Sequence, residues 1–483
     1  MEDEASSSAR KPKRPRVAPA AAAAAAAWEP HFTYLPIADA LKQRPRARVC
    51  LFAVVAEIGA AFHSSGTDFT VTLRIVDESR KAGISATFFA QEPDLLPCVK
   101  SNGDVISLRD VMVKCYLEEF FIAVDKRLSS FALFESKVSA ECSPYQTSKN
   151  YHGSKHDKER LTQLRTWLPL GLKDFGLKDL ELQLRSLKSD STFDLVCKVL
   201  HVLKHKDKWI FYVWDGTDTP AAEFQAISDA EAVASPALPR ELLCTMPCIG
   251  TVLRIFSDRP VNKASHMQQG TYWARFCNIT CKREFGIWKG VFLKRSRVRL
   301  LSHEDGSVVD RLKMYDSRNA NKVLHQPMGS FPSNVAVLSD EYEEEGYSTL
   351  MESLTHPEVT HKVKTLVRVV AFYPCEAYEL HLLLRSNYDY SIRLTLEDPT
   401  ARIDAYVHKQ NLVQFFGDSL TEVVVMKKLN KLLGIPESED GDEVVPMSWN
   451  SPWIWCVMSS YYCEKTDPWG SRRYRIVDTT IRD

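Results

Sequence analysis

Three segments of the chain share one pattern of hydrophobic and polar positions. In each, an apolar stretch runs into an acidic turn and then into a second apolar stretch, which predicts a β-hairpin. The first stretches are residues 71–78, 210–217 and 392–399, and their partners are 84–89, 221–224 and 401–407. A hairpin with a longer strand before it and two strands after it is the middle of an OB barrel, which commonly binds single-stranded nucleic acid. The prediction is a mostly β chain of three tandem OB-fold barrels with short helices.

The first barrel is predicted over residues 30–142. Its elements are a strand at 48–58, the hairpin of 69–76 with 84–89, a short helix at 94–99, a fourth strand at 105–115 and a closing strand at 131–135. A polar stretch at 143–157 is predicted to be a linker.

The second unit is predicted over residues 158–310, as a helix followed by a barrel. Leucines at helical spacing within 158–187 predict a helix that packs the second barrel against the first. The barrel begins at Thr192, with its fourth strand at 249–255 and its last at 291–301.

The third unit is predicted over residues 346–483, after a linker at 311–345, and is assigned to protein interaction. Its predicted elements are a strand at 361–373, the hairpin at 392–407, a helix at 419–433 that ends at Gly434, and closing strands at 453–458 and 474–477.

The ends and the composition narrow the class of protein. Residues 1–29 combine a basic cluster at 11–16 with a run of alanines, so we predict a disordered tail; the cluster is either a nuclear localisation signal or a solvated run of charge. No apolar run suggests a membrane span or a secretory signal. Twelve cysteines without dense spacing favour a reducing compartment, cytosol or nucleus.

Charge is divided unevenly although the formal net charge is zero. Residues 31–310 hold 38 Lys and Arg against 33 Asp and Glu, whereas residues 311–483 hold 19 against 25. The surplus in the first part is small, so nucleic acid would have to be held by stacking and fitted contacts more than by charge.

No motif argues for catalysis. The chain lacks a phosphate-binding Gly-rich loop that ends in Lys-Ser/Thr, a His-Glu-x-x-His and a Gly-x-Ser-x-Gly. Asp77 and Asp215 are interpreted mainly as turn residues, since Asp accepts local backbone hydrogen bonds. Cys244, Cys248, Cys277 and Cys281 form two C-x3-C pairs; isolated buried thiols are favoured over zinc, and no metal or cofactor is predicted.

Rings and arginines on the strands are the candidates for nucleic-acid contact. Phe89 ends the first hairpin, and Tyr116 ends the fourth strand of the first barrel. Phe62 lies in the loop before Gly66, which leads into the second strand of that barrel. Each ring has core packing as its alternative. Arg295, Arg297 and Arg299 alternate on one strand and share a face, which forms either a track for phosphates or a solvated surface.

Several short motifs in order resemble the protection-of-telomeres family, which binds the single-stranded overhang at chromosome ends. They are FTYLPI (32–37), GTDF (66–69), IVD (75–77), NGD (102–104), FALFE (131–135), LRTW (164–167) and VWDGTDTP (213–220), with YY (461–462) and DPWG (467–470) resembling the C-terminal region of plant members.

The resemblance implies recognition of G-rich telomeric single-stranded DNA by the first two barrels. The implied contacts are Phe62, Gly66, Thr67, Asp68, Phe89, Tyr116, Trp214 and Asp215. Arg295 and Arg297 are added to these candidates from their alternation on one strand, as a phosphate track. It also implies nuclear localisation at telomeres, and partners such as telomerase or the lagging-strand accessory complex, bound through the third barrel.

The chain also departs from this family pattern. Ser65 stands where many relatives carry Lys, which removes a phosphate contact. A scaffold with weak DNA affinity that acts on telomerase or its accessory complex is therefore the alternative.

Overall fold

A computed structural model gives the structure of the chain. It describes residues 33–482 apart from 45, 65, 117–118, 172–180, 206–207, 221–239, 244–245, 248, 262–263, 269–270, 285–286, 320–332, 343, 375–376, 387, 419 and 436–450. The predicted tail at 1–29 and the strand at 221–224 lie outside these residues. Among the described helices, none is long and apolar enough to cross a membrane.

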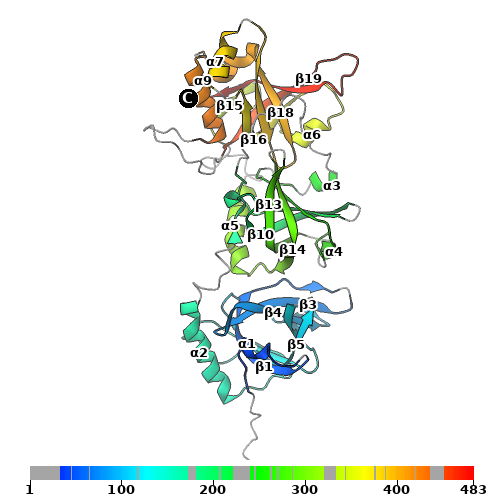
Figure 1. Cartoon of the computed structure of the whole chain (residues 1–483), viewed down its shortest axis with the longest axis vertical. Helices are drawn as coiled ribbons and strands as arrows, with labels where there is room; N and C mark the ends of the chain where they lie inside the picture. Colours follow the sequence, from blue (N-terminus) through cyan, green and yellow to red (C-terminus); the bar gives the residue numbers. More distant parts are fainter. Residues whose placement is uncertain are drawn as a thin grey trace, which may run out of the picture.

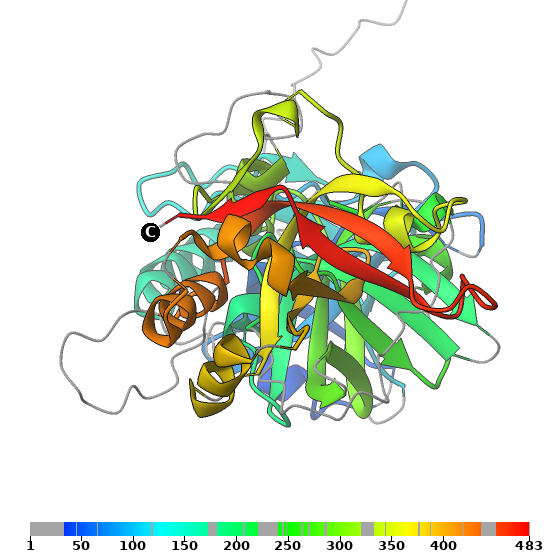
Figure 2. The same cartoon turned by 90° about the horizontal axis from the view of Figure 1, so that it is seen from above.

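Three closed five-stranded barrels follow one another along the chain, which confirms the predicted fold class. They are stacked in a row along the long axis of the molecule (Figure 1), and the view from above shows them superimposed end-on (Figure 2). Each barrel closes in the OB order, in which the third and fifth strands run parallel.

The first barrel is made by β1 (Arg48–Glu57), β3 (Phe69–Asp77), β4 (Arg80–Ala90), β5 (Val105–Tyr116) and β6 (Glu119–Val124). The closing strand was predicted at 131–135, and this is wrong. β6 closes the ring by pairing with β4 and β5, while β7 (Ser130–Phe134) pairs with β5 outside it. Shorter elements complete the unit: α1 (Ile37–Ala40), β2 (Phe62–His63), η1 (Pro93–Leu95) and β8 (Gln146–Thr147).

The second barrel is made by β10 (Thr192–His205), β11 (Lys208–Trp214), β12 (Leu253–Ser257), β13 (Tyr272–Glu284) and β14 (Ile287–Leu301). The stretch predicted as its fourth strand is the third, because β12 pairs with β11 and with β14. Beside it lie β9 (Glu181–Leu182), η3 (Leu184–Ser186), α3 (Arg240–Leu243) and α4 (Ala264–Met267).

The third barrel is made by β16 (Lys362–Tyr373), β17 (Ser391–Glu397), β18 (Arg402–His408), β19 (Trp453–Tyr462) and β20 (Arg472–Val477). The predicted helix is α9 (Glu422–Leu433), and it ends at Gly434 in the left-handed conformation, as predicted. The remaining elements are β15 (Ala336–Leu338), η5 (Asp340–Tyr342), α6 (Leu350–Leu354), α7 (Ala377–Arg385), η6 (Lys409–Asn411), α8 (Leu412–Phe416) and β21 (Thr479–Ile481).

Two predictions about the segments between barrels differ from the structure. The helix predicted within 158–187 is α2 (Lys155–Gly171), but it packs Leu161 and Leu164 against Phe52 and Phe134, so it covers the first barrel and does not bridge the two. The start of the linker predicted at 311–345 is instead helical. α5 (Gly306–Asn319) packs against the second barrel, where the Tyr315 ring lies 4.9 Å from that of Trp214.

A buried aspartate at the end of the second strand is repeated in all three barrels. One carboxylate oxygen of Asp77, Asp215 and Asp398 accepts a backbone N–H from the segment that precedes the barrel, at 2.7, 2.9 and 2.7 Å. The other oxygen accepts the N–H and hydroxyl of a Ser or Thr two residues on. The local bonds confirm the turn interpretation, whereas the bond to the preceding segment was not predicted. We call this pair of contacts the latch, because it ties the turn to the segment before the barrel.

The first two barrels are joined through a buried carboxylate. Arg299 Nη1 of β14 lies 3.1 Å from Glu57 Oε1, and Arg275 Nε of β13 lies 2.8 Å from Oε2, as an ion pair without hydrogen-bond geometry. Burial alone would raise the pKa of Glu57, but Arg299 and Arg275 outweigh it and leave the pKa lowered.

Backbone contacts fix the same junction. Gly59 pairs with Leu301, and Ser302 donates to the Ile58 carbonyl at 2.8 Å. A Cβ at Gly59 would lie 2.0 Å from the Thr72 carbonyl oxygen, so this crossing requires glycine.

The second and third barrels are also in direct contact. Arg368 of β16 donates to the Thr219 carbonyl at 2.9 Å, and Trp453 Nε1 donates to Asp218 at 2.9 Å. Glu397 Oε2 also lies 2.7 Å from Arg368 Nη2. The side chains of Arg368, Trp453 and Asp218 are all buried.

Replacing Asp398 with alanine is expected to destabilise the third barrel. Four donors from Leu350, Thr400 and Ala401 lose their acceptor. At about 1–3 kcal/mol for each buried unsatisfied group, we expect a loss of about 3 kcal/mol or more, measured by denaturant unfolding. The exposed Asp418→Ala is the matched control. Equal midpoints for the two variants would contradict the latch.

Replacing Glu57 with glutamine is expected to cost about 3 kcal/mol at neutral pH, because the partly exposed Arg299 loses its counter-charge and the buried Arg275 keeps only Glu181. Since the folded pKa of Glu57 is lowered from 4.5, its contribution is complete above that pH and is lost as the pH falls through the lowered value. The stability gap between wild type and variant should therefore shrink below pH 4.5. A gap that stays constant on acidification would rule this out; the exposed Glu159→Gln serves as control.

Candidate nucleic-acid interface

The outer face of the first barrel is a strip formed by β3, β4 and β6. Val71, Leu73 and Ile75 point into the core, so the alternate residues of β3 point outward. On the strip, Thr72 opposes Thr87, Arg74 opposes Ser85, and Ser85 lies beside Phe121 of β6. This is the face with which OB folds bind oligonucleotides.

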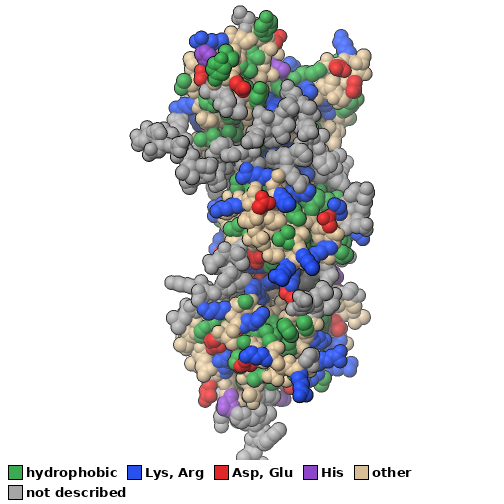
Figure 3. Space-filling view, viewed as in Figure 1, with side chains coloured by type: hydrophobic (Ala, Val, Ile, Leu, Met, Phe, Trp, Pro, Cys, Tyr) green, Lys and Arg blue, Asp and Glu red, His purple; other side chains and the backbone are tan. Residues whose placement is uncertain are grey.

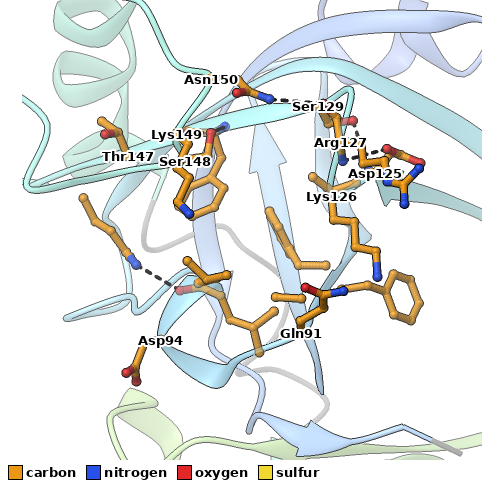
Figure 4. A pocket seen from close by; sticks show the side chains of 18 residues that line it. Gln91, Asp94, Asp125, Lys126, Arg127, Ser129, Thr147, Ser148, Lys149 and Asn150 are labelled. Carbon is orange, nitrogen blue, oxygen red and sulfur yellow. Dashed lines mark hydrogen bonds between the residues drawn. The ribbon is translucent and has the colours of Figure 1, made fainter. Parts of the chain in front are cut away.

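One end of the strip carries an exposed ring beside a cavity of about 390 Å³. Phe89 is 41% exposed and lines this cavity together with Gln91, Lys126 and Asn150. Figure 4 shows Lys126 and Arg127 on one side of the cavity, opposite Lys149. A ring with cations around it suits an unpaired base and its phosphate.

A tight turn positions Lys126. The side chain of Asp125 accepts the N–H groups of Arg127 and Leu128 at 2.9 and 3.0 Å, and these bonds lower the pKa of Asp125. Lys126 Nζ in turn lies 2.8 Å from Asp68 Oδ2. The turn after β6 is thus tied to the loop before β3 across the end of the strip.

The other end of the strip opens into a cleft between the first two barrels. This junction cleft has a volume of about 1070 Å³. Its described lining holds one carboxylate, Glu119, two rings, Phe120 and Phe121, and the cations Arg46, Arg74, Arg80, Lys114, Arg297 and Arg299. Figure 3 shows Lys and Arg side chains on both barrels around their junction. The local charge is strongly positive although the chain is neutral.

The cations of the junction cleft differ in their partners. Arg297 is paired with Glu119 across the barrels, and Arg299 with Glu57. Burial, and then the nearby Arg299, lower the pKa of Arg74. The exposed Lys114 side chain pairs with no residue that the structure describes. The exposed Arg46 is likewise without a side-chain partner among the described residues, so Lys114 and Arg46 are the cations best placed to meet a phosphate.

Predicted contacts in the first barrel are distributed over the strip and its edge. Gly66 and Thr67 are exposed in the turn between β2 and β3, and Asp68 is paired with Lys126. The half-buried Phe62 ring lies 5.1 Å from that of His266 in α4, so it packs between the barrels. β5 ends at Tyr116, whose side chain lies outside the described part.

Two predicted contacts in the second barrel do not fit the structure. Trp214 and Asp215 are completely buried: the Trp214 indole donates to the Thr217 carbonyl at 2.9 Å, and Asp215 holds the latch. Both residues are excluded from a surface interface. Arg295 and Arg297 are exposed on β14, but of these two only Arg297 lines the junction cleft.

Sequence reasoning missed the residues that depend on β6. Arg74 and Lys114 could have been predicted as outward-facing residues from the alternation of β3 and β5. Phe121 and Lys126 could not have been predicted, because no strand was expected at 119–124. In addition, their neighbours come from distant segments, namely β4 and the loop before β3.

Metal binding finds no support in the described residues, which contain no group of three or more His, Cys, Asp or Glu side chains fit to hold an ion. Cys277 and Cys281 are free and buried, and burial raises the pKa of both thiols to about 12. Cys244 and Cys248 lie outside the described residues.

Two family models match the chain. Residues 29–169 match the model described as telomeric single stranded DNA binding POT1/CDC13, and residues 332–467 match the POT1A-like OB fold domain. The first match covers the strip, and the second covers most of the third barrel.

Curated relatives and solved structures are similar over different lengths. Protection of telomeres protein 1b of Arabidopsis thaliana is 30% identical over 457 residues, 93% of this chain and 98% of its own length. Protein 1a of the same plant is 30% identical over 473 residues, 92% and 97% of the two chains. A fission yeast Pot1 structure with single-stranded DNA is 14% identical, with a TM-score of 0.27 over 59% of this chain and 95% of that one. The near full-length identity to the plant proteins shows that the chain belongs to the protection of telomeres family.

Proposed function

We propose that the chain binds the G-rich single strand of telomeric DNA along a path from Phe89, across the outer strip of the first barrel, into the junction cleft. Binding there would protect the chromosome end and limit the access of telomerase to the 3′ terminus. The observation that carries the proposal is the continuity of this path: an exposed ring at one end and a cleft rich in cations at the other.

The strip supplies the two kinds of contact that an unpaired strand needs. Phe89 and the cleft rings Phe120 and Phe121 offer faces for bases, each stacked base being worth about 1–3 kcal/mol. Thr67 and Asp68 offer acceptors for the N–H groups of guanine edges. Sequence preference would come from these acceptors.

The third barrel has a surface suited to a protein partner. Tyr378 and Leu382 of α7 and Val423 of α9 are 71%, 53% and 75% exposed. Exposed apolar side chains gathered on packed helices are typical of protein contacts, and we assign this face to a telomere-associated protein, such as telomerase or the lagging-strand accessory complex. The proposed setting is the telomere in the nucleus, and the proposed role is not enzymatic.

A second candidate is a telomerase-associated scaffold with weak DNA affinity. It is favoured by the internal pairing of Lys126 with Asp68 and of Arg297 with Glu119, which leaves fewer cations for phosphates. A titration with G-rich telomeric repeats and with the complementary C-rich strand separates the candidates. Preference for the G-rich strand supports the first; no measurable affinity for it, together with recovery of telomerase activity, supports the second.

Phe89→Ala is expected to weaken binding of the G-rich strand by about 1–3 kcal/mol, because a stacking face is lost. The ring is 41% exposed, so the thermal midpoint should change little. Leu128→Ala, at a side chain 60% exposed on the same barrel, is the control for loss of apolar surface. Unchanged affinity in Phe89→Ala would remove this ring from the interface.

Lys114→Ala is expected to lower the salt dependence of binding. Loss of one phosphate contact on a single strand should reduce the slope of log K against log salt concentration by about 0.7. Fluorescence anisotropy over a salt series measures it, with the exposed Lys42→Ala as control. If both variants keep the wild-type slope, the junction cleft does not hold the backbone.

A further inference from the structure

The third barrel has its own outward strip, formed by β17, β18 and β20, in the same topological place as the strip of the first barrel. Leu394, Ala405 and Tyr474 point into the core, so their neighbours along each strand point outward. On this side Arg393 opposes Tyr406, and Tyr406 lies beside Arg475. Figure 1 shows β18 and β19 on one side of this barrel, with α7 and α9 on the other.

Aromatic rings form a connected group on this strip. The rings of Tyr406 and His408 are stacked at 6.3 Å, with an angle of 21° between their planes. Tyr461 of β19 meets His408 edge-on at 5.5 Å, and its hydroxyl lies 3.1 Å from His408 Nε2. All three rings are only half-buried. Rings that are fixed in position and half-exposed present faces to a ligand.

Cations flank these rings. Arg475 lies 5.8 Å from the Tyr461 ring, and the exposed Arg473 opposes Tyr461 across the strands. Neither arginine is ion-paired with a described residue, and Arg475 Nε is a buried donor without a hydrogen-bond partner among them. The nearby acid, Asp404, accepts from Thr395 Oγ1 at 2.8 Å. In contrast to Arg297 and Arg299, these two guanidinium groups pair with no carboxylate in the part of the chain that the structure describes.

We propose that this surface, the third-barrel face, is a second binding site for single-stranded nucleic acid, separate from the path through the first two barrels. We define it as Arg393, Tyr406, His408, Tyr461, Arg473 and Arg475. Bases stack on Tyr406 and Tyr461, and phosphates lie against Arg473 and Arg475.

The chemistry of the face favours nucleic acid over a protein partner. Alternating rings and guanidinium groups on the outer strip of an OB barrel provide both a stacking platform and backbone contacts. The apolar side chains suited to a protein, Tyr378, Leu382 and Val423, lie on α7 and α9 instead. Both partners could therefore occupy the third barrel together.

The test compares two oligonucleotide lengths on the full chain by fluorescence anisotropy. A strand of about 12 nucleotides suits the first two barrels, whereas one of about 30 can also reach the third. The double variant Tyr406→Ala with Arg473→Glu is expected to bind the long strand at least five-fold more weakly and the short strand as wild type does. The matched control, Tyr378→Ala with Arg385→Glu, removes an exposed ring and reverses an exposed cation on α7, away from the face.

A second measurement does not depend on the variants folding well. Long DNA and RNA strands that carry photoreactive 5-iodouracil are crosslinked to wild-type chain, and the modified peptides are identified by mass spectrometry. Crosslinks in β18, β19 or β20 support the site, and the two arms show which nucleic acid it prefers. Crosslinks confined to residues 33–319 together with unchanged long-strand affinity of the double variant would overturn it. Failure of the telomeric proposal would appear separately, as loss of preference for the G-rich short strand.

Discussion

The buried carboxylate of Glu57 is the contact on which the arrangement of the first two barrels depends. It brings Arg275 and Arg299 of one barrel to the end of β1 of the other, where Gly59 and Leu301 continue the pairing of the backbones. Without Glu57, the buried Arg275 would keep only Glu181, and the partly exposed Arg299 would have no carboxylate partner among the described residues. The cleft that opens beside this contact is lined by cations of both barrels.

Charge is used sparingly in this molecule. The formal net charge is zero, and several cations near the proposed path are already engaged with carboxylates. At Lys126 and Arg297 a phosphate has to displace an acid of the chain before it gains the cation, which weakens indiscriminate binding of polyanions at these two positions. On the proposed path, stacking on rings such as Phe89 would then carry a larger share of the affinity, which would favour unpaired bases over duplex.

Much of the fold could be predicted from the sequence because the hairpin pattern is local. The three acidic turns, the strand at 105–115 and the stop of α9 at Gly434 all follow from neighbouring residues. The errors concern long-range pairing: β6 closes the first barrel by meeting β4, and β12 takes the third place in the second barrel by meeting β11. Likewise, the exposed position of Phe89 could be proposed from its place at a strand end, whereas the burial of Trp214 depends on α5, about 100 residues later.

The repeated aspartate has a consequence for how the molecule divides into independent pieces. In each barrel the buried aspartate accepts a hydrogen bond from a residue that lies before the first long strand. The backbone N–H groups of Ile37, Leu184 and Leu350 donate to Asp77, Asp215 and Asp398, respectively. A fragment that begins at the first long strand would lack this N–H donor, and the buried carboxylate would lose one of its hydrogen bonds. The N-terminal border of each barrel domain thus lies before Ile37, Leu184 and Leu350, respectively, so each domain includes the donor that its buried aspartate requires.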